Sequence, residues 1–109
     1  MQAEILLTLR LQQKLFADPR RIALLKQIEQ TGSISQGAKN AGISYKSAWD
    51  AINDMNTLSE QPLVDRATGG KGGGGAIVTR YGQRLIQLYD LLAQIQQKAF
   101  DALSDDDHV

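Results

Sequence analysis

The sequence predicts a mainly α-helical domain with a small β wing, meaning one short hairpin, and three observations lead to this fold class. Four segments carry apolar residues at the three- and four-residue spacing of an amphipathic helix, and each follows a residue that can cap a helix. Two short apolar runs, 62–66 and 76–79, flank a loop with six glycines in seven positions. The length of 109 residues allows only one hydrophobic core.

Composition excludes several kinds of site. Hydrophobic residues make up 42% and charged residues 22%, as in ordinary globular proteins. Cysteine is absent, which excludes disulfides and thiolate chemistry, and the single histidine, His108, is next to last, which argues against a histidine-dependent triad or metal site. No apolar run approaches the ~20 residues of a membrane span, and the start lacks the basic stretch of a secretory signal. We therefore expect a cytoplasmic protein that contacts no membrane.

Charge is balanced in sum but not in place. Residues 1–84 hold eleven basic and seven acidic side chains, a net charge of +4, whereas residues 85–109 carry a net charge of −4. A basic body with an acidic tail fits an anionic partner bound away from the tail. A scatter of solvated charges explains the same numbers equally well.

Two helices are predicted near the start. The first covers about 19–30, because Asp18 can cap it and Pro19 suits its first position. The second is short: Ser33 and Gln36 match a capping box, in which Ser33 caps the helix and Gln36 reaches back to the cap residue. Each helix is expected to end at a glycine, Gly32 and Gly42 respectively.

A third helix is predicted from 45 to about 56, with Ser44 as its cap. Ile52 and Met55, with Ala48, form its apolar side, and Trp49 at the edge is expected to pack beneath the helix rather than stack on a base. The opposite side is polar and consists of Lys46, Ser47, Asp50, Asn53 and Asp54.

Strand structure is predicted in two places. Residues 4–12 alternate apolar and polar side chains, as in a half-buried strand. Segments 62–66 and 76–79 are expected to form a hairpin whose tip, 69–75, is almost all glycine. That tip is not a nucleotide-binding phosphate loop, because Lys71 is followed by glycine and then a strand. It is a wing that contacts DNA or a plain flexible loop.

A long final helix is predicted over about 80–103, capped by Thr79. Twenty-odd residues rise ~35 Å, whereas a domain of this size has a radius of gyration of ~13 Å, so the helix should overhang its own body. A second copy of the helix is the simplest partner for the overhang, which predicts a homodimer; the alternative is a helix lying wholly on its own core. The candidate dimerisation residues, spaced 3-4-3-4, are Leu85, Leu88, Leu92, Ile95 and Ala99, with a second stripe in the same rhythm beside them.

The short capped helix, the glycine turn and the polar-faced helix together describe a helix-turn-helix, and the hairpin makes it the winged variety. One helix fits the ~12 Å major groove, where base edges present distinct donor and acceptor patterns. We therefore expect double-stranded DNA as the partner, with helix 45–56 in the major groove and the wing, 69–75, on adjacent backbone or minor groove; a dimer predicts a palindromic operator. The candidate DNA-binding residues are Ser33, Ser35, Gln36, Ser44, Tyr45, Lys46, Ser47, Asp50, Asn53, Arg66, Lys71, Arg80 and Arg84.

Several of these residues admit a second interpretation. Tyr45, Arg80 and Arg84 either contact phosphates or are solvated side chains. Asp50 and Asp54 repel phosphates, which argues against a DNA contact. Their alternative roles are to set the register of the helix, to accept a hydrogen bond from cytosine or to orient a neighbouring lysine. No nucleophile–base pair is evident, so we expect no enzymatic activity. The alternative function is a winged-helix protein-interaction module that dimerises without binding DNA.

The run from Thr31 to Trp49, TGSISQGAKNAGISYKSAW, resembles the helix-turn-helix of the ModE family of molybdate-dependent transcriptional regulators. The segment RATGGKGGGGA at 66–76, followed by TRYG at 79–82, is similar to the wing of that family and the start of its linker helix. The resemblance covers essentially the whole chain, and a weaker similarity to the LysR-type winged module supports the same fold. The domains expected from it are a winged helix-turn-helix at 1–79, a linker and dimerisation helix at 80–104 and an acidic tail at 105–109.

The resemblance also implies a function. Members of the ModE family are dimers that repress the molybdate transporter operon and stimulate some molybdoenzyme operons, and they sense molybdate through C-terminal β-barrel domains. Those domains are missing from this sequence. We therefore expect DNA binding without molybdate, and no cofactor in this chain.

Overall fold

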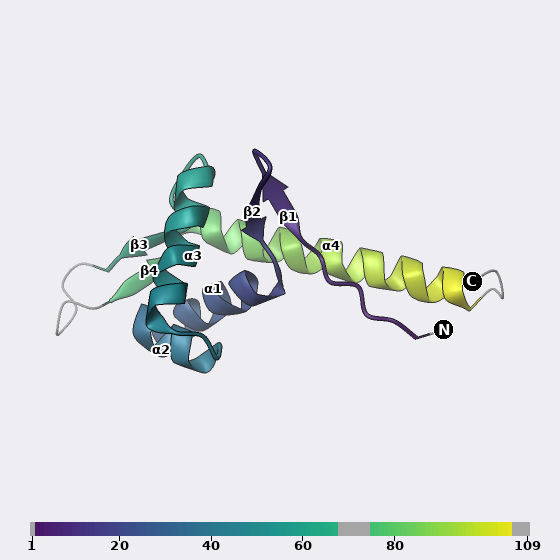
Figure 1. The fold of residues 1–109 in the computed structure, drawn as a ribbon, viewed down its shortest axis with the longest axis horizontal. Helices are drawn as coiled ribbons and strands as arrows, with labels where there is room; N and C mark the ends of the chain where they lie inside the picture. Colours follow the sequence, from purple (N-terminus) through teal and green to yellow (C-terminus); the bar gives the residue numbers. More distant parts are fainter. Residues whose placement is uncertain (1, 68–74, 106–109) are drawn as a thin grey trace.

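Helices dominate the structure, which confirms the predicted fold class. The computed structural model describes residues 2–67 and 75–105. Two strands are followed by three helices, two further strands and one long helix (Figure 1). The elements are β1 Leu9–Leu11, β2 Lys14–Ala17, α1 Pro19–Thr31, α2 Ile34–Asn40, α3 Tyr45–Leu58, β3 Val64–Arg66, β4 Ala76–Val78 and α4 Arg80–Ser104.

The helices begin at the predicted caps. The Asp18 carboxylate accepts a hydrogen bond from the Arg21 N–H (2.8 Å), and the Ser33 hydroxyl accepts one from the Gln36 N–H (3.1 Å). The hydroxyls of Ser44 and Thr79 cap α3 and α4 in the same way. Each cap satisfies a backbone donor that has no partner within its helix.

The capping box at α2 is only half formed, so that prediction was wrong for Gln36. Its side chain donates to Asn40 (3.0 Å) instead of reaching back to the Ser33 N–H. The Ser33 N–H has its own acceptor, the Thr31 hydroxyl (3.3 Å). The side chain of Gln36 is therefore free to bond one turn further along α2.

The N-terminal region differs from the single strand predicted over 4–12. β1 is short and pairs antiparallel with β2 through a turn at Gln12 and Gln13, whose φ values of 53° and 66° are left-handed. Two-residue turns of this kind are usually signalled by Asn or Gly, and the sequence has neither there. The second strand therefore escaped prediction.

Residues 2–8 are extended but belong to no sheet; they lie along α4 (Figure 1). The Ile5 N–H donates to the Gln97 side chain (2.9 Å), and the Tyr89 hydroxyl donates to the Leu7 carbonyl (2.6 Å). Burial, followed by the nearby carboxylates of Asp18 and Asp90, raises the pKa of Tyr89, which further favours the protonated hydroxyl that donates this bond. The alternation of apolar residues reflects packing on a helix rather than on a sheet.

The predicted hairpin between 62–66 and 76–79 is confirmed, although each strand is shorter than expected. β3 and β4 pair antiparallel, with Val64 opposite Val78. The hairpin base is fixed to the helices, because the Ala76 N–H donates to the Gly32 carbonyl (2.9 Å) at the turn between α1 and α2. The glycine tip with Lys71 lies outside the described residues.

α4 reaches well beyond the rest of the fold (Figure 1), and the molecule measures 57 × 28 × 22 Å. The overhang predicted from helix length is therefore confirmed. The first half of the helix contributes Leu85, Ile86 and Tyr89 to the core, and Leu92 and Ala93 pack partly against it. Leu88 in the same half, and Leu91 and Ile95 beyond Tyr89, are each more than half exposed. Among the described residues, none of the helices is both long and apolar enough to cross a membrane.

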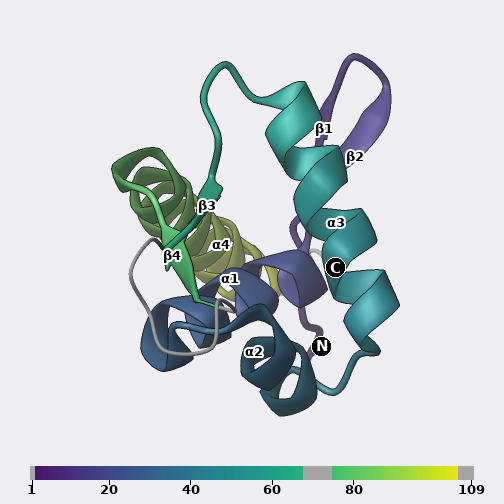
Figure 2. The same cartoon turned by 90° about the vertical axis from the view of Figure 1, so that its left-hand side faces the viewer.

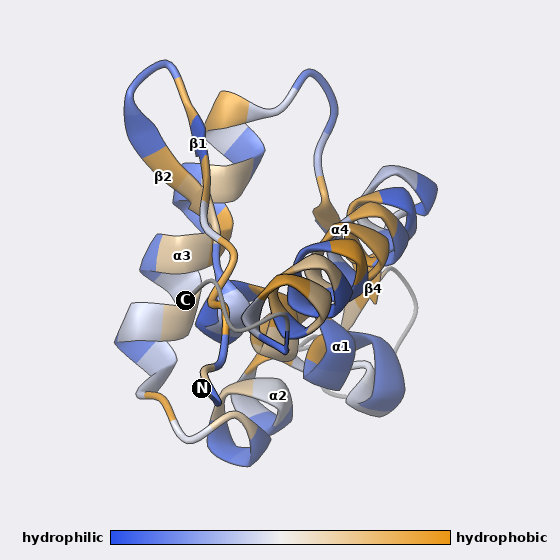
Figure 3. Ribbon diagram, turned by 90° about the vertical axis from the view of Figure 1, so that its right-hand side faces the viewer, coloured by the Kyte–Doolittle hydropathy of each residue, from blue (hydrophilic) through white to orange (hydrophobic). Residues whose placement is uncertain are grey.

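The core lies where α1, α3 and the first turns of α4 meet the two hairpins. Its most deeply buried large side chains are Leu24, Leu25, Ile28, Met55 and Leu63. Figure 3 shows hydrophilic and hydrophobic residues alternating along the helices, as expected for elements with one buried side. Gly37 allows α2 to approach α1 closely, since a Cβ there would lie 2.8 Å from Ile28 Cγ1.

Candidate nucleic-acid interface

The polar face predicted for α3 points away from the core. Ala48, Ile52 and Met55 are buried on the inner side, while Lys46 and Asn53 are exposed on the other. Seen from the wing end, α3 lies at one side of α1, with β3 and β4 across from it and the β1–β2 hairpin beside its C-terminal half (Figure 2). The candidate residues Ser44, Tyr45, Lys46, Ser47, Asp50 and Asn53 are all exposed.

Lys46 and Asp50 form an ion pair on this exposed face. Lys46 Nζ lies 2.8 Å from Asp50 Oδ2, one helical turn away. The hydrogen bond and the charge of Asp50 raise the pKa of Lys46, which further favours the cationic form of the lysine. Of the uses considered for Asp50, orienting a neighbouring lysine matches this geometry. The pair also offsets the repulsion that Asp50 alone would exert on a phosphate.

Three aromatic and cationic side chains gather on the wing side of α3. The rings of Tyr45 and Trp49 meet edge to face with centroids 6.2 Å apart, and the Arg66 guanidinium lies 5.9 Å from the Trp49 centroid. Trp49 is half-buried and packs against the core, as expected. With Ser33 and Ser35 these residues line a hollow of about 270 Å³ between α2, α3 and the wing base.

Asn56, which was not among the candidates predicted from the sequence, fixes the wing base to α3. Its side chain accepts a hydrogen bond from the Leu63 N–H (2.8 Å) and donates one to the Val64 carbonyl (3.1 Å). Both bonds satisfy backbone groups at the start of β3, so the distance between α3 and the wing is set by one amide. An asparagine inside a helix gives no local sign of such a distant contact.

The remaining candidates do not all join this surface. Gln36 is engaged with Asn40 within α2, as described above. Arg80 is exposed at the start of α4. Arg84 lies elsewhere, since it lines an apolar hollow with residues of β1, β2 and α4. Lys71 lies outside the described residues.

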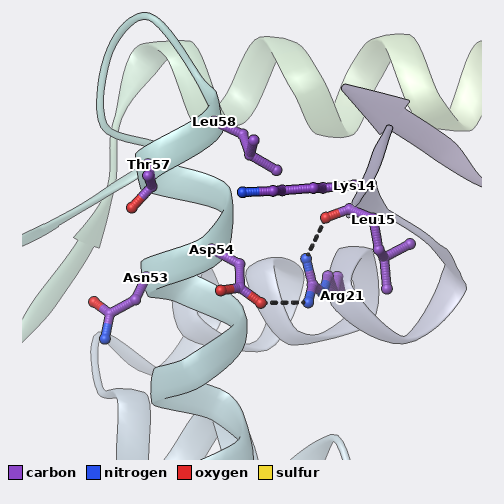
Figure 4. A pocket seen from close by; sticks show the side chains of 7 residues that line it. All are labelled: Lys14, Leu15, Arg21, Asn53, Asp54, Thr57 and Leu58. Carbon is purple, nitrogen blue, oxygen red and sulfur yellow. Dashed lines mark hydrogen bonds and ion pairs between the residues drawn. The ribbon is translucent and has the colours of Figure 1, made fainter. Parts of the chain in front are cut away.

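The other side of α3 faces the β1–β2 hairpin (Figure 4). Arg21 bridges the two: its guanidinium donates to Asp54 Oδ2 (3.0 Å) and to the Leu15 carbonyl (2.9 Å). Lys14 lies across the same hollow, which Asn53 also lines. Arg21 therefore sets the position of the hairpin against α3 in the way that Asn56 sets the position of the wing.

Replacing Arg21 with alanine is expected to loosen the β1–β2 hairpin and to lower the free energy of unfolding by about 1 kcal/mol. Hydrogen bonds to charged groups stabilise proteins by ~1.5–3 kcal/mol. The loss expected here is below that range because the Asp54 side chain is 58% exposed and solvent weakens the pair. Urea unfolding measures the loss, and amide exchange should accelerate in 9–17. Lys98→Ala, which removes the same charge from the far part of α4, is the control; equal exchange in both variants contradicts the bridging role.

The family model described as "Bacterial regulatory helix-turn-helix protein, lysR family" matches residues 19–83, which is more than half of the chain. The chain belongs to this LysR family. The match covers α1 to α3, the wing and the first turn of α4, so the surface described above lies almost wholly within it. β1 and β2 precede the matched region.

Curated relatives of this LysR-family chain carry a more specific name. It is 86% identical over 107 residues to "DNA-binding transcriptional dual regulator ModE" of Escherichia coli (strain K12), covering 98% of this chain and 41% of that protein. It is 59% identical over 103 residues to "Transcriptional regulator ModE" of Haemophilus influenzae, covering 94% and 40%. The resemblance to ModE is thus confirmed, and the chain spans about 40% of the length of these relatives.

A solved structure supports the fold of this LysR-family chain at low sequence identity. The crystal structure of ArgP from Mycobacterium tuberculosis superposes with a TM-score of 0.56 at 20% identity. The aligned part covers 80% of this chain and 31% of that one. At this identity the likeness extends to the fold alone.

Proposed function

We propose that this chain is the sequence-specific DNA-binding unit of a bacterial transcriptional regulator of molybdate transport and molybdoenzyme genes. The observation that carries the proposal is the outward polar face of α3, which stands between the wing base and the β1–β2 hairpin with its side chains exposed. A helix presented in this way fits the major groove, where short polar side chains reach base edges. The names of the relatives supply the link to gene regulation and to ModE.

The proposal assigns base contacts to α3 and phosphate contacts to the residues around it. Lys46, Ser47, Asp50 and Asn53 face the groove. Ser44 and Tyr45, at the N-terminal end of α3, together with Ser33, Ser35 and Arg66, border it on the side of α2 and the wing. Lys71 extends the contact along the backbone, and Arg80 reaches it from the wing base. Phosphate contacts fix register and orientation, whereas base contacts carry the sequence.

The proposed regulator acts as a homodimer through α4. Ile95 is 55% exposed on the part of the helix that overhangs the body, and Leu88 is 52% exposed beside β1, whereas Leu85 is buried in the core of its own chain. Of the candidate residues, Leu88, Ile95 and Ala99 therefore remain for the partner helix, while Leu92 packs partly against its own core. Covering such side chains is favourable by ~25 cal/mol for each Å² of apolar surface. The dimer places two α3 helices on one duplex and thus predicts a palindromic site.

Selection of bound duplexes from a random pool tests the proposal. A recovered palindrome, with half-sites about one helical turn apart or a multiple of that, is the expected result. Sedimentation at micromolar concentration should give the mass of a dimer. In the ModE family, molybdate sensing is expected in the C-terminal β-barrel domains. Added molybdate should therefore leave the DNA binding of this chain unchanged. No affinity for any duplex at low salt would instead favour the protein-interaction module.

A further inference from the structure

Basic side chains border α3 on the side opposite the wing. Lys14 comes from β2, and Arg20 and Arg21 come from the first turn of α1. Together with α3 they line two neighbouring hollows of about 400 and 220 Å³. The α3 residues in these hollows include Ser47, Asp50 and Asn53, which belong to the candidate base-reading face. The two hollows share Leu15 and Arg21, so the basic side chains adjoin that face; Figure 4 shows Lys14 and Arg21 beside α3.

Asn53 marks the middle of this surface. It lines the hollow that contains Lys14 and also a second hollow that contains Arg66 on the wing side. Lys14 and Arg66 thus lie on opposite sides of the same helix. A helix seated in the major groove has a phosphate backbone along each of its sides, so cations on both sides match the charge of the duplex.

Two of these cations are available for a ligand. Arg21 is engaged by Asp54 and by the Leu15 carbonyl. Lys14 and Arg20 are exposed and have no ion-pair partner among residues 2–67 and 75–105. The three carboxylates nearby are already occupied: Asp18 caps α1, Asp50 pairs with Lys46 and Asp54 pairs with Arg21.

The hairpin holds Lys14 in a fixed place beside α3. Gln12 and Gln13 both adopt left-handed backbone conformations, which is unfavourable for residues other than glycine, asparagine and aspartate. The Arg10 guanidinium donates to the Gln13 carbonyl and stabilises the turn. Lys14 is the first residue after this turn, and Arg21 fixes the next residue, Leu15, to α3 through its carbonyl.

We propose that the β1–β2 hairpin and the first turn of α1 form a second phosphate-contacting margin, opposite the wing, with Lys14 and Arg20 as the contacting residues. The inference rests on the proposed DNA-binding function and adds to it an element outside the LysR-family match, since β1 and β2 precede residue 19. The hairpin thus acts as a second wing, one whose turn contains no glycine.

Salt dependence of binding tests the margin without knowledge of the operator. The probe is a mixed-sequence duplex of about 30 base pairs, long enough for two half-sites one helical turn apart. The double variant Lys14→Gln with Arg20→Gln should bind at least about tenfold more weakly at ~0.1 M salt, and the slope of log K against log salt should fall by about 0.9 for each phosphate that is no longer neutralised. Lys14→Arg with Arg20→Lys keeps both charges and should retain the slope.

Two controls separate the margin from general effects of charge and folding. Lys98→Gln removes a cation from the far part of α4 and should leave the slope unchanged. Gln12→Asn with Gln13→Gly supplies a favoured turn sequence and should keep both the hairpin and the binding. Circular dichroism establishes that each variant is folded.

The outcomes distinguish the two proposals. If the parent binds and the double variant matches it in affinity and slope, the second margin is wrong while the DNA-binding function stands. An equal loss in the Lys98→Gln variant also overturns the margin. If the parent binds no duplex at low salt, the DNA-binding function itself fails, and the margin fails with it.

Discussion

Gly82→Ala is expected to destabilise the fold by about 3 kcal/mol, at the upper end of the range for an overpacked core. A Cβ at this position would lie 2.4 Å from the Leu63 carbonyl oxygen and 2.8 Å from Val78 Cγ1. The first contact is with backbone, which cannot rotate away as a side chain can. The first turn of α4 would have to move away from Leu63, just before β3, and from Val78 of β4, so the wing base should loosen together with the core.

The sign of the change makes the test decisive. In an ordinary helix the same substitution stabilises by up to ~1 kcal/mol, because alanine has the higher helix propensity. Urea unfolding of the two proteins gives the difference in free energy. Gln83→Ala, at the neighbouring exposed position, is the control and should change stability little. A Gly82→Ala protein as stable as the parent would contradict the close approach of α4 to the Leu63 carbonyl.

Much of this fold could be predicted because its signals are local. Each helix start is indicated by a capping residue, and each cap depends only on residues within one turn. The four caps are Asp18, Ser33, Ser44 and Thr79. The overhang of α4 follows from its length alone. The β1–β2 hairpin lacks such a signal, since Gln12 and Gln13 do not favour a turn. Its geometry is held by the Arg10 side chain and by packing against α3.

In the candidate site, too, local features could be predicted from the sequence and long-range contacts could not. Helical periodicity places Lys46, Asp50 and Asn53 on one face of α3, and the structure agrees. The contacts that position this face join residues far apart in sequence, such as Arg21 with Asp54, 33 positions away. Arg84 illustrates the converse: its place near the wing in the sequence suggested a DNA contact, yet the turn of α4 carries it toward β1. Periodicity identifies a face, but not what lies beside it.

Lys46→Ala, Ser47→Ala and Asn53→Ala are each expected to weaken binding to the selected operator by ~1–3 kcal/mol, if each reads a base. The folded state should survive all three changes because the side chains are exposed. Ser47→Ala also keeps the cap of α3, since the Ser44 hydroxyl accepts from the Ser47 backbone N–H (3.0 Å). Anisotropy titrations on the selected duplex and on a scrambled one separate specific from general affinity. Operator binding equal to the parent in all three variants would remove α3 from the groove.

Because Lys46 and Asp50 form an ion pair, the affinity lost on Lys46→Ala depends on whether Asp50 is present. On the proposed DNA-binding face, Lys46→Ala removes a contact and also leaves the Asp50 carboxylate alone, where it would repel phosphates. The single variant should therefore lose more affinity than the double variant Lys46→Ala with Asp50→Ala, even though the double variant lacks more side chains. A double-mutant cycle measures this coupling directly. If Asp50 instead accepts a hydrogen bond from a cytosine, the double variant binds more weakly than either single one, so the same four titrations identify which role Asp50 has at the interface.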